Sequence, residues 1–234
     1  MEIIAEIGQN HNGDMGLARE LIAAAKGAGA DVAKFQLFRA AETFPPPARN
    51  PWYDYNCSTE LKRADVEMLA GECARQGIEF MASVFQPDLV DWLEAVSMPR
   101  YKIASRSVNE PALLARVAET GKPMIVSLGM WDGPSFPAMP APRSCVDFLY
   151  CISKYPTPFE DLKLSQVDFG AYGGFSDHTI GVEASMVALA RGARIIEKHL
   201  TLDKDMHGPD HSCSITPDEL ATLVAFKKVC EACL

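Results

Sequence analysis

The sequence has no apolar run near the roughly 20 residues that a membrane-spanning helix needs, so we expect no membrane segment. Its first residues, MEIIAEIGQNHNG, lack the basic and then apolar regions of a secretory signal peptide. The seven cysteines are odd in number and scattered, and a single CxxC pair, Cys230 and Cys233, is only a weak zinc signal. Together these absences predict a protein of the reducing cytoplasm.

A basic block is also missing, because 22 lysines and arginines stand against 31 acidic residues for a formal net charge of −9. We therefore expect no nucleic-acid partner. No GxGxxG motif follows the first expected strand, which argues against a dinucleotide-binding fold. The composition that remains, 48% hydrophobic and 23% charged, is typical of a globular protein.

Strand and helix patterns alternate along the whole chain. Eight short apolar segments read as strands, at residues 2–8, 31–38, 78–85, 100–104, 123–128, 146–150, 172–175 and 194–198. Helical patterns separate them, including one over 58–75 with Ser58 or Thr59 as its cap, and another closes the chain over 217–233 with Thr216 and Glu219 as a capping box. Residues 131–143 contain four prolines, so the fifth helix is expected to be replaced by a loop.

This alternation predicts an α/β protein with a parallel sheet, and eight units predict closure into a (β/α)₈ TIM barrel. An open doubly wound sheet is the alternative. We expect residues 1–234 to form one barrel domain, since the length suits a single barrel. In barrels the active site lies at the carboxyl ends of the strands. The polar residues expected there are Glu6, Lys34, Gln36, Ser83, Lys102, Ser105, Ser127, Ser153, Ser176, His178, Glu197 and His199.

The chemistry of these residues suggests a metal and an anion. Neighbouring strands lie about 4.8 Å apart, so His178 and His199 can converge on one divalent ion such as Mn²⁺, Mg²⁺ or Zn²⁺. Buried lysines at 34 and 102 need an anion to remain charged, and serine hydroxyls can help to bind a phosphate or carboxylate. Glu6 and Glu197 could hold a proton or a metal-bound water.

Plainer explanations exist for each group. A histidine at the end of a strand is more often a hydrogen-bonded structural residue than a ligand. Either lysine could equally form a structural ion pair with Glu6 or Glu197.

Six motifs resemble those of the sialic acid synthase family, which includes legionaminic, pseudaminic and spore-coat sugar-acid synthases. They are AEIGQNHNGD (5–14), AGADVAKFQ (28–36), YKIAS (101–105), YPTP (155–158), FSDHTIG (175–181) and EKHLTLDKDMHGPDH (197–211). The resemblance implies a transferase that forms a carbon–carbon bond between phosphoenolpyruvate and an aldose such as an N-acyl aminosugar, yielding a sialic-type sugar acid and phosphate.

The resemblance also assigns residue roles. It implies that His178 and His199 bind Mn²⁺ or Mg²⁺, with Glu6 and Glu197 beside the reacting centre as further catalytic residues. It implies phosphoenolpyruvate binding by Lys34, Lys102, Ser105, Ser127, Ser153 and Ser176, and sugar binding by Gln36, Tyr155 and Asp210.

Two departures from the family predict an altered acceptor. Arg106 and Ser107 replace the usual Gly-Glu after the fourth strand, and the sequence ends where relatives continue into an antifreeze-like domain that supplies an arginine across a dimer. We therefore expect a barrel without that domain, and either a homodimer or a partner chain that provides the missing contact. A metal-dependent aldolase or isomerase and a non-catalytic barrel subunit are the alternatives.

Overall fold

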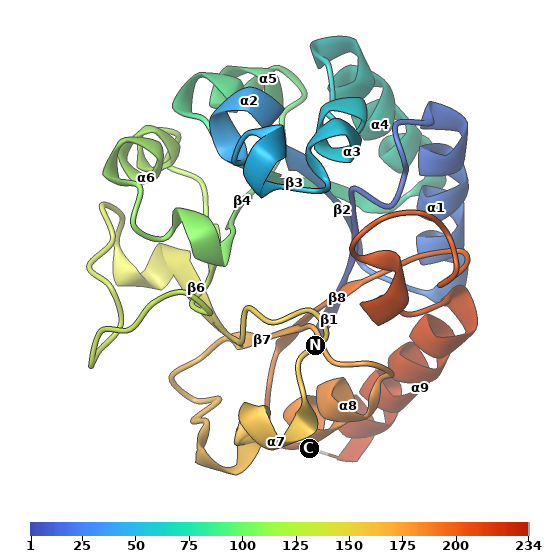
Figure 1. The fold of residues 1–234 in the computed structure, drawn as a ribbon. Helices are drawn as coiled ribbons and strands as arrows, with labels where there is room; N and C mark the ends of the chain where they lie inside the picture. Colours follow the sequence, from blue (N-terminus) through green and yellow to red (C-terminus); the bar gives the residue numbers. More distant parts are fainter. Residues whose placement is uncertain (234) are drawn as a thin grey trace.

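The computed structural model describes residues 1–233, in which eight parallel strands close into a barrel surrounded by helices (Figure 1). The strands are β1 (Glu2–Gly8), β2 (Val32–Leu37), β3 (Glu79–Val84), β4 (Tyr101–Ile103), β5 (Met124–Ser127), β6 (Val146–Cys151), β7 (Gly174–Asp177) and β8 (Ile195–His199). The α-helices are α1 (Met15–Ala28), α2 (Ala40–Thr43), α3 (Tyr53–Ser58), α4 (Arg63–Gln76), α5 (Val90–Ala95), α6 (Pro111–Ala118), α7 (Phe159–Leu162), α8 (Glu183–Ala190) and α9 (Pro217–Cys233). Short 3₁₀ helices are η1 (Pro47–Arg49), η2 (Pro87–Leu89), η3 (Ser105–Ser107), η4 (Arg143–Cys145), η5 (Leu164–Gln166) and η6 (His211–Cys213).

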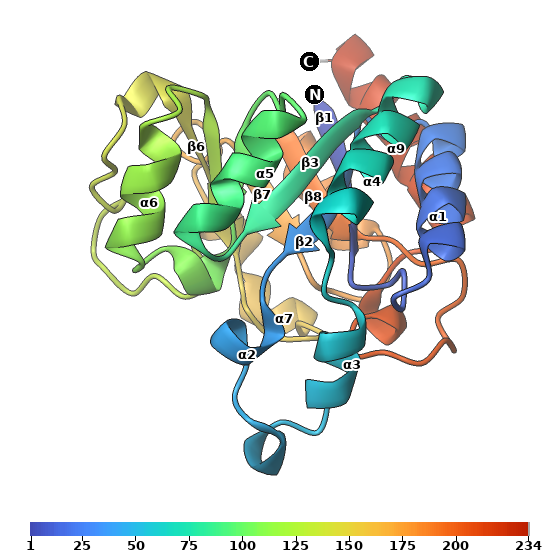
Figure 2. The ribbon, with the colours of Figure 1, turned by 90° about the horizontal axis from the view of Figure 1, so that it is seen from above.

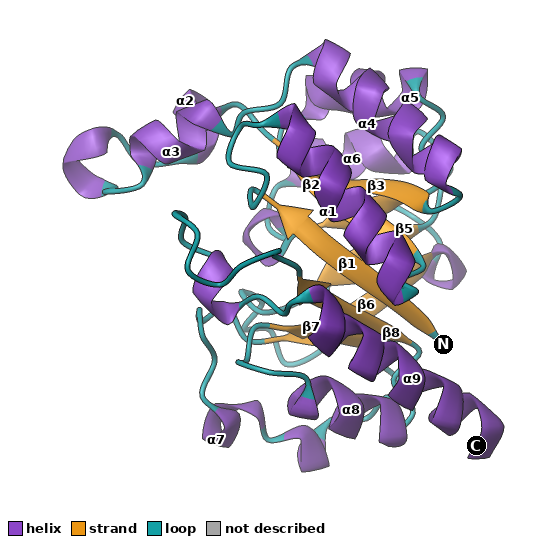
Figure 3. Ribbon diagram, turned by 90° about the vertical axis from the view of Figure 1, so that its right-hand side faces the viewer, coloured by secondary structure: helices purple, strands orange, loops and turns teal. Residues whose placement is uncertain are grey.

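The strands follow one another around the barrel in chain order, and β1 closes it by pairing with both β2 and β8. Ile4, for example, lies opposite Val32 on one side and Glu197 on the other. All strands point the same way, so their carboxyl ends meet at the end of the barrel where α2 and α3 project (Figure 3). The expected (β/α)₈ barrel is confirmed.

A layer of six apolar side chains fills the interior of the barrel. They come from six different strands, and each is at most 6% exposed: Ile4, Val32, Met81, Ile125, Leu149 and Ile195. Because side chains alternate along a strand, the residue two positions later points inward as well. That next inward layer includes Glu6, Lys34 and Glu197, so the polar cavity rests directly on an apolar floor.

The outer helices begin where capping groups satisfy their free N–H groups. Asp14 accepts hydrogen bonds from the N–H groups of Gly16 and Leu17 at the start of α1. At the start of α9, Thr216 and Glu219 form the expected capping box, with the Thr216 N–H donating to Glu219 at 2.8 Å. Among residues 1–233, no helix is both long enough and apolar enough to cross a membrane.

The helix expected over residues 58–75 was wrong at its start. α3 ends at Ser58 and α4 begins only at Arg63, so neither Ser58 nor Thr59 caps the start of a helix. The Thr59 hydroxyl is instead buried and lies 2.7 Å from Oε1 of Gln9, to which it donates a hydrogen bond. Its polar side chain thus serves a tertiary contact that a local pattern does not reveal. The seventh strand also begins two residues later than expected, and His178 follows it rather than ending it.

The connection from β2 to α4 is long and contains the short elements α2, η1 and α3. These elements extend beyond the carboxyl ends of the strands (Figure 2). The connection therefore forms one wall of the cavity at that end of the barrel.

The proline-rich segment at residues 131–143 replaces the helix between β5 and β6, as the sequence predicted. Phe136 takes over part of the missing helix's packing. Its ring stacks on Phe148 with centroids 4.7 Å apart and meets the ring of Tyr172 edge-on at 4.9 Å. The Arg143 guanidinium covers the same aromatic cluster, 4.9 Å from the centre of the Phe148 ring.

We predict that Phe136→Ala lowers the free energy of unfolding by about 2–4 kcal/mol, because it leaves a cavity against Phe148 and Tyr172. Urea denaturation measures this difference. Phe159→Ala on α7 is the matched control, because its ring is 56% exposed and its loss should change stability by less than about 0.5 kcal/mol. Equal effects of the two substitutions would contradict this account of the loop.

Candidate active site

A cavity of about 890 Å³ opens at the carboxyl ends of the strands. Its wall contains all fourteen side chains that the sequence predicted for the site, namely Glu6, Lys34, Gln36, Ser83, Lys102, Ser105, Ser127, Ser153, Tyr155, Ser176, His178, Glu197, His199 and Asp210. The structure therefore brings these residues together in one place, while the roles assigned to them stay predictions.

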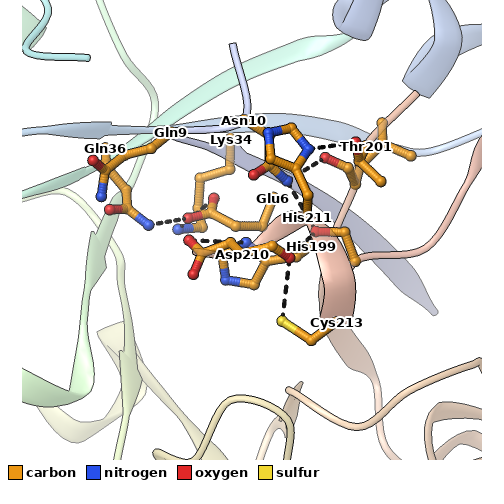
Figure 4. Close-up of polar contacts among 12 residues, drawn as sticks. Glu6, Gln9, Asn10, Lys34, Gln36, His199, Thr201, Asp210, His211 and Cys213 are labelled. Atoms are coloured by element: carbon orange, nitrogen blue, oxygen red, sulfur yellow. Dashed lines mark hydrogen bonds and ion pairs between the residues drawn. The ribbon is translucent and has the colours of Figure 1, made fainter. Parts of the chain in front are cut away.

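Four buried charged side chains form the bottom of this cavity. Nζ of Lys34 lies 2.8 Å from a carboxylate oxygen of Glu6 and 3.4 Å from one of Glu197. Nζ of Lys102 lies 3.5 Å from Glu197, and Gln36 donates to Glu6 at 2.8 Å (Figure 4). The ion pairs that the sequence left open as an alternative are thus present. Two carboxylates neutralise two ammonium groups, which offsets the large cost of burying each charge alone.

Burial and mutual attraction set the protonation of this cluster. Burial raises the pKa of Glu6 above its ordinary value, because Lys34 does not compensate for lost hydration and for repulsion by Glu197. Burial alone would also raise the pKa of Glu197, but Lys102 and Lys34 lower it to about 2. Glu197 is therefore the stable anion, and Glu6 is the carboxyl group better suited to hold a proton.

Serine hydroxyls extend the charged cluster. Lys34 donates to the Ser83 hydroxyl at 2.9 Å and Lys102 to the Ser127 hydroxyl at 2.8 Å. The Ser176 hydroxyl donates to Glu197 at 2.8 Å. These hydroxyls can rotate to donate to an anion that binds against the two lysines.

Gly129 packs closely against side chains of the cavity wall. A Cβ atom at this position would lie 2.5 Å from Oγ of Ser153, 2.8 Å from Sγ of Cys151 and 3.0 Å from Oγ of Ser105. The Gly129 N–H itself donates to the Ser105 hydroxyl at 3.0 Å. A larger residue at this position would therefore push the Ser105 and Ser153 hydroxyls out of place.

The rings of His178 and His199 face each other beside the charged cluster, with centroids 5.7 Å apart. Nδ1 of His178 lies 3.0 Å from the Ile152 carbonyl oxygen, which can only accept, so in the neutral ring Nδ1 carries the proton and Nε2 the lone pair. Nδ1 of His199 is buried, lies 3.8 Å from a carboxylate oxygen of Asp210 and has no hydrogen-bond partner within residues 1–233 (Figure 4). Burial lowers the pKa of His199 to about 4, so this ring is neutral near pH 7.

This donor set fits a divalent cation. The rings of His178 and His199 offer nitrogen lone pairs, and the unpartnered Nδ1 of His199 is a buried polar atom of the kind that a ligand or ion satisfies. Across residues 1–233, no group of three or more His, Cys, Asp or Glu side chains is placed to hold a metal ion. An ion held by the two rings would take its other ligands from water or substrate oxygens.

The side chains predicted to contact a sugar lie around the histidine pair. The Tyr155 ring packs against His178 with centroids 4.0 Å apart and remains 52% exposed toward the cavity. Asp210 lies next to His199, and Gln36 is bound to Glu6.

Sequence reasoning missed most of the outer wall of the cavity. This outer wall contains amide side chains and aromatic rings, namely Gln9, Phe44, Asn50, Trp52, Asn56, Phe85 and Gln86. Four of them belong to the connection between β2 and α4, whose unusual length was the one signal in the sequence. Nothing in the local pattern distinguished the individual residues.

Arg106 occupies the rim of the outer wall. Its guanidinium lies over the rings of Phe44 and Phe85, at 5.1 and 5.9 Å from their centres, and donates to the Thr43 carbonyl at 2.5 Å. Within residues 1–233 no carboxylate forms an ion pair with it. The aromatic rings hold the cation in place while most of its N–H groups stay free for a ligand.

Three loops are tied together beside the cavity. Oδ1 of Asn12 accepts hydrogen bonds from the Tyr55 hydroxyl at 2.7 Å and from Nε2 of His211 at 3.0 Å. Nδ1 of His211 lies 2.7 Å from the Thr201 hydroxyl (Figure 4). The loop after β1, the connection after β2 and the loop after β8 therefore share one polar network, which fixes the wall of the site.

Comparison with known proteins places the chain in a family. Residues 21–234 match the NeuB family. The chain belongs to the NeuB family. The resemblance that the motifs suggested is thereby confirmed.

Two curated relatives and one solved structure illustrate this family. N,N'-diacetyllegionaminic acid synthase of Legionella pneumophila is 34% identical over 254 residues, which cover 95% of this chain and 70% of that protein. N-acetylneuraminate-9-phosphate synthase of Homo sapiens is 34% identical over 257 residues, covering 99% and 70%. The N-acetylneuraminic acid synthetase of Leptospira borgpetersenii, solved with citrate, superposes with a TM-score of 0.87 at 30% identity, covering 99% of this chain and 84% of that one.

His11, in the first of the three loops, predicts a pH dependence of stability. The ring is fully buried and accepts a hydrogen bond from the Gly13 N–H, and burial lowers its pKa to about 4 from about 6.5 in the unfolded chain. The unfolded chain therefore binds more protons between these values, and this ring should make stability fall by about 1.4 kcal/mol per pH unit as the pH drops from 6.5 to 4.

Urea denaturation at pH 7, 6 and 5 measures this slope. His11→Asn should reduce it by about that amount, since asparagine keeps an acceptor for the Gly13 N–H and does not titrate. Identical slopes in the two proteins would refute the assignment.

Proposed function

We propose that this chain is a synthase that condenses phosphoenolpyruvate with an aldose and releases phosphate. The observation that carries the proposal is the pair of buried lysines, ringed by hydroxyls, next to two facing imidazoles in one cavity. Phosphoenolpyruvate carries a phosphate and a carboxylate, so it matches two cations and several hydroxyl donors. Membership of the NeuB family and the names of the relatives support the same reaction.

The cavity offers separate places for the two anionic groups and for the acceptor. Lys34 and Lys102 would bind phosphoenolpyruvate at the bottom, and the hydroxyls of Ser105 and Ser153 in the cavity wall would donate hydrogen bonds to one of its anionic groups. The acceptor would then lie above it, toward Tyr155. Depth in the barrel excludes water from the lysines and strengthens their attraction for an anion.

The reaction forms one carbon–carbon bond, between C3 of phosphoenolpyruvate and the aldehyde carbon, while water adds to C2 and phosphate leaves. The water gives up both of its protons as C2 becomes a ketone: one ends on the aldehyde oxygen, and the other leaves on the phosphate. Burial raises the pKa of Glu6, so this carboxyl group can hold a proton on its way from the water to the aldehyde oxygen. Glu197 stays ionised and keeps both lysines in place. A divalent ion, Mn²⁺ or Mg²⁺, held by His178 and His199 would supply Lewis-acid polarisation of the aldehyde.

We further propose that the acceptor specificity of this chain is altered and that its acceptor carries an anionic group. The amides and aromatic rings of the outer wall suit the hydroxyls and apolar faces of a sugar. At the rim, Arg106 presents unpaired N–H groups where relatives have glycine, and Ser107 stands where they have glutamate. Replacing an acid by a hydroxyl and adding a cation shifts the local charge toward binding an anion.

The first test is phosphate release from phosphoenolpyruvate in the presence of Mn²⁺ and a panel of N-acyl aminosugars. We expect release that requires all three components. Gly129→Ala should weaken phosphoenolpyruvate binding by at least about 10-fold, because the added methyl group would displace the hydroxyls of Ser105 and Ser153.

Gly71→Ala is the matched control, because nothing lies within 4 Å of a Cβ atom at that position on α4. Calorimetric titration with phosphoenolpyruvate should show unchanged affinity in this variant. If the unmodified protein showed no phosphate release and no binding of phosphoenolpyruvate, the proposed function would be overturned.

The second test compares an N-acyl aminohexose with its 6-phosphate as acceptor. We expect the phosphorylated sugar to be preferred, and Arg106→Gln to lower kcat/KM for it by about 10-fold to 100-fold, the range of a lost charge-assisted hydrogen bond. The neutral sugar should be little affected. Arg75→Gln, on the exposed surface of α4, is the control. Equal loss for both sugars would contradict an anion-binding role for Arg106.

A further inference from the structure

We propose that the buried ion pair between Asp177 and Lys198 positions the rings of His178 and His199. This inference rests on the proposed function, in which the two rings bind a divalent ion. Asp177 and Lys198 face away from the cavity, between the barrel and helix α8. Neither belongs to the cavity wall, so their effect on the site would be exerted through the rings.

The pair joins the ends of two strands just where the histidines begin. Asp177 is the last residue of β7 and lies opposite Lys198 in the register of β8. Nζ of Lys198 lies 3.1 Å from Oδ2 of Asp177, and both side chains are fully buried. His178 and His199 each follow one member of the pair, so the contact holds the two backbones that carry the rings.

Lys198 fixes His178 from both sides. It binds Asp177, which precedes the histidine, and donates at 2.5 Å to the carbonyl oxygen of Thr179, which follows it. Oδ1 of Asp177 accepts the Thr179 N–H at 2.8 Å and closes a tight turn around His178. Oδ2 accepts the hydroxyl of Ser185 at 2.6 Å, which anchors the turn to α8.

Stability alone does not account for this arrangement. A fully buried ion pair often contributes no more to stability than an uncharged pair of similar shape, because both charges lose their hydration. The hydrogen bonds to Thr179 are directional, however, and they tie the backbone after His178 to Asp177 and Lys198. A metal site tolerates little displacement of its ligands, and groups that orient ligating histidines commonly change metal affinity about 10-fold to 100-fold.

The experiment replaces the pair by an uncharged one, Asp177→Asn with Lys198→Met. Asparagine can still accept a hydrogen bond from the Thr179 N–H and contact the Ser185 hydroxyl. Because both charges are removed together, no buried charge is left unpaired. We measure Mn²⁺ binding by electron paramagnetic resonance of the free ion, the thermal midpoint, and the ¹⁵N resonances of the imidazoles. The expected result is a 10-fold to 100-fold loss of Mn²⁺ affinity and an altered His178 signal in a folded protein.

The matched control makes the same change in a second ion pair, Asp31→Asn with Lys227→Met. In this pair Nζ of Lys227 lies 2.7 Å from Oδ2 of Asp31, between α9 and the start of β2. We expect unchanged Mn²⁺ affinity in this variant, whatever its thermal midpoint.

Unchanged affinity and an unchanged His178 signal in the first variant would overturn the inference. If the unmodified protein binds no Mn²⁺, the metal part of the proposed function fails. The imidazole resonances then decide the inference separately, because they report ring position without a metal. If the first variant does not fold, Ser185→Ala, which frees only the anchor of the turn, must shift the His178 resonances for the inference to stand.

Discussion

Charged groups can remain inside this barrel only because each has an opposite charge within reach. Glu6, Glu197, Lys34 and Lys102 sit above a floor of apolar side chains and form one nearly neutral cluster. The alternation of side chains along parallel strands creates this arrangement, since the same face of β1, β2 and β8 is apolar in one layer and charged in the next. The serine hydroxyls bind this cluster, the histidine pair lies beside it, and the outer wall belongs to the same cavity.

Much of this could be predicted from the sequence because the relevant signals are periodic and local. The alternation of short apolar strands with helices predicted the barrel, and strand ends predicted the polar cavity. The four prolines at residues 131–143 predicted a missing helix. Residues such as Glu197 and His199 were identifiable because a buried strand rarely carries polar groups unless it ends in a site.

The remaining features depend on contacts between distant parts of the chain. Thr59 resembled a helix cap, yet it is buried against Gln9 because three loops pack together. The sequence did not indicate that Phe44 and Trp52 line the cavity. An irregular connection has no side-chain periodicity that would show which way each side chain points. The pairing of both lysines with carboxylates was an open alternative, because strand order and register decide which charges meet.

The apolar floor limits the route by which molecules can enter and leave the cavity. Six interlocked side chains seal the amino-terminal end, so molecules enter and leave by one mouth. Any anion held by Lys34 and Lys102 therefore travels past the place where a ligand of Arg106 would sit. If an acceptor fills the outer wall, an anion at the two lysines would have to bind before it and could leave only after it.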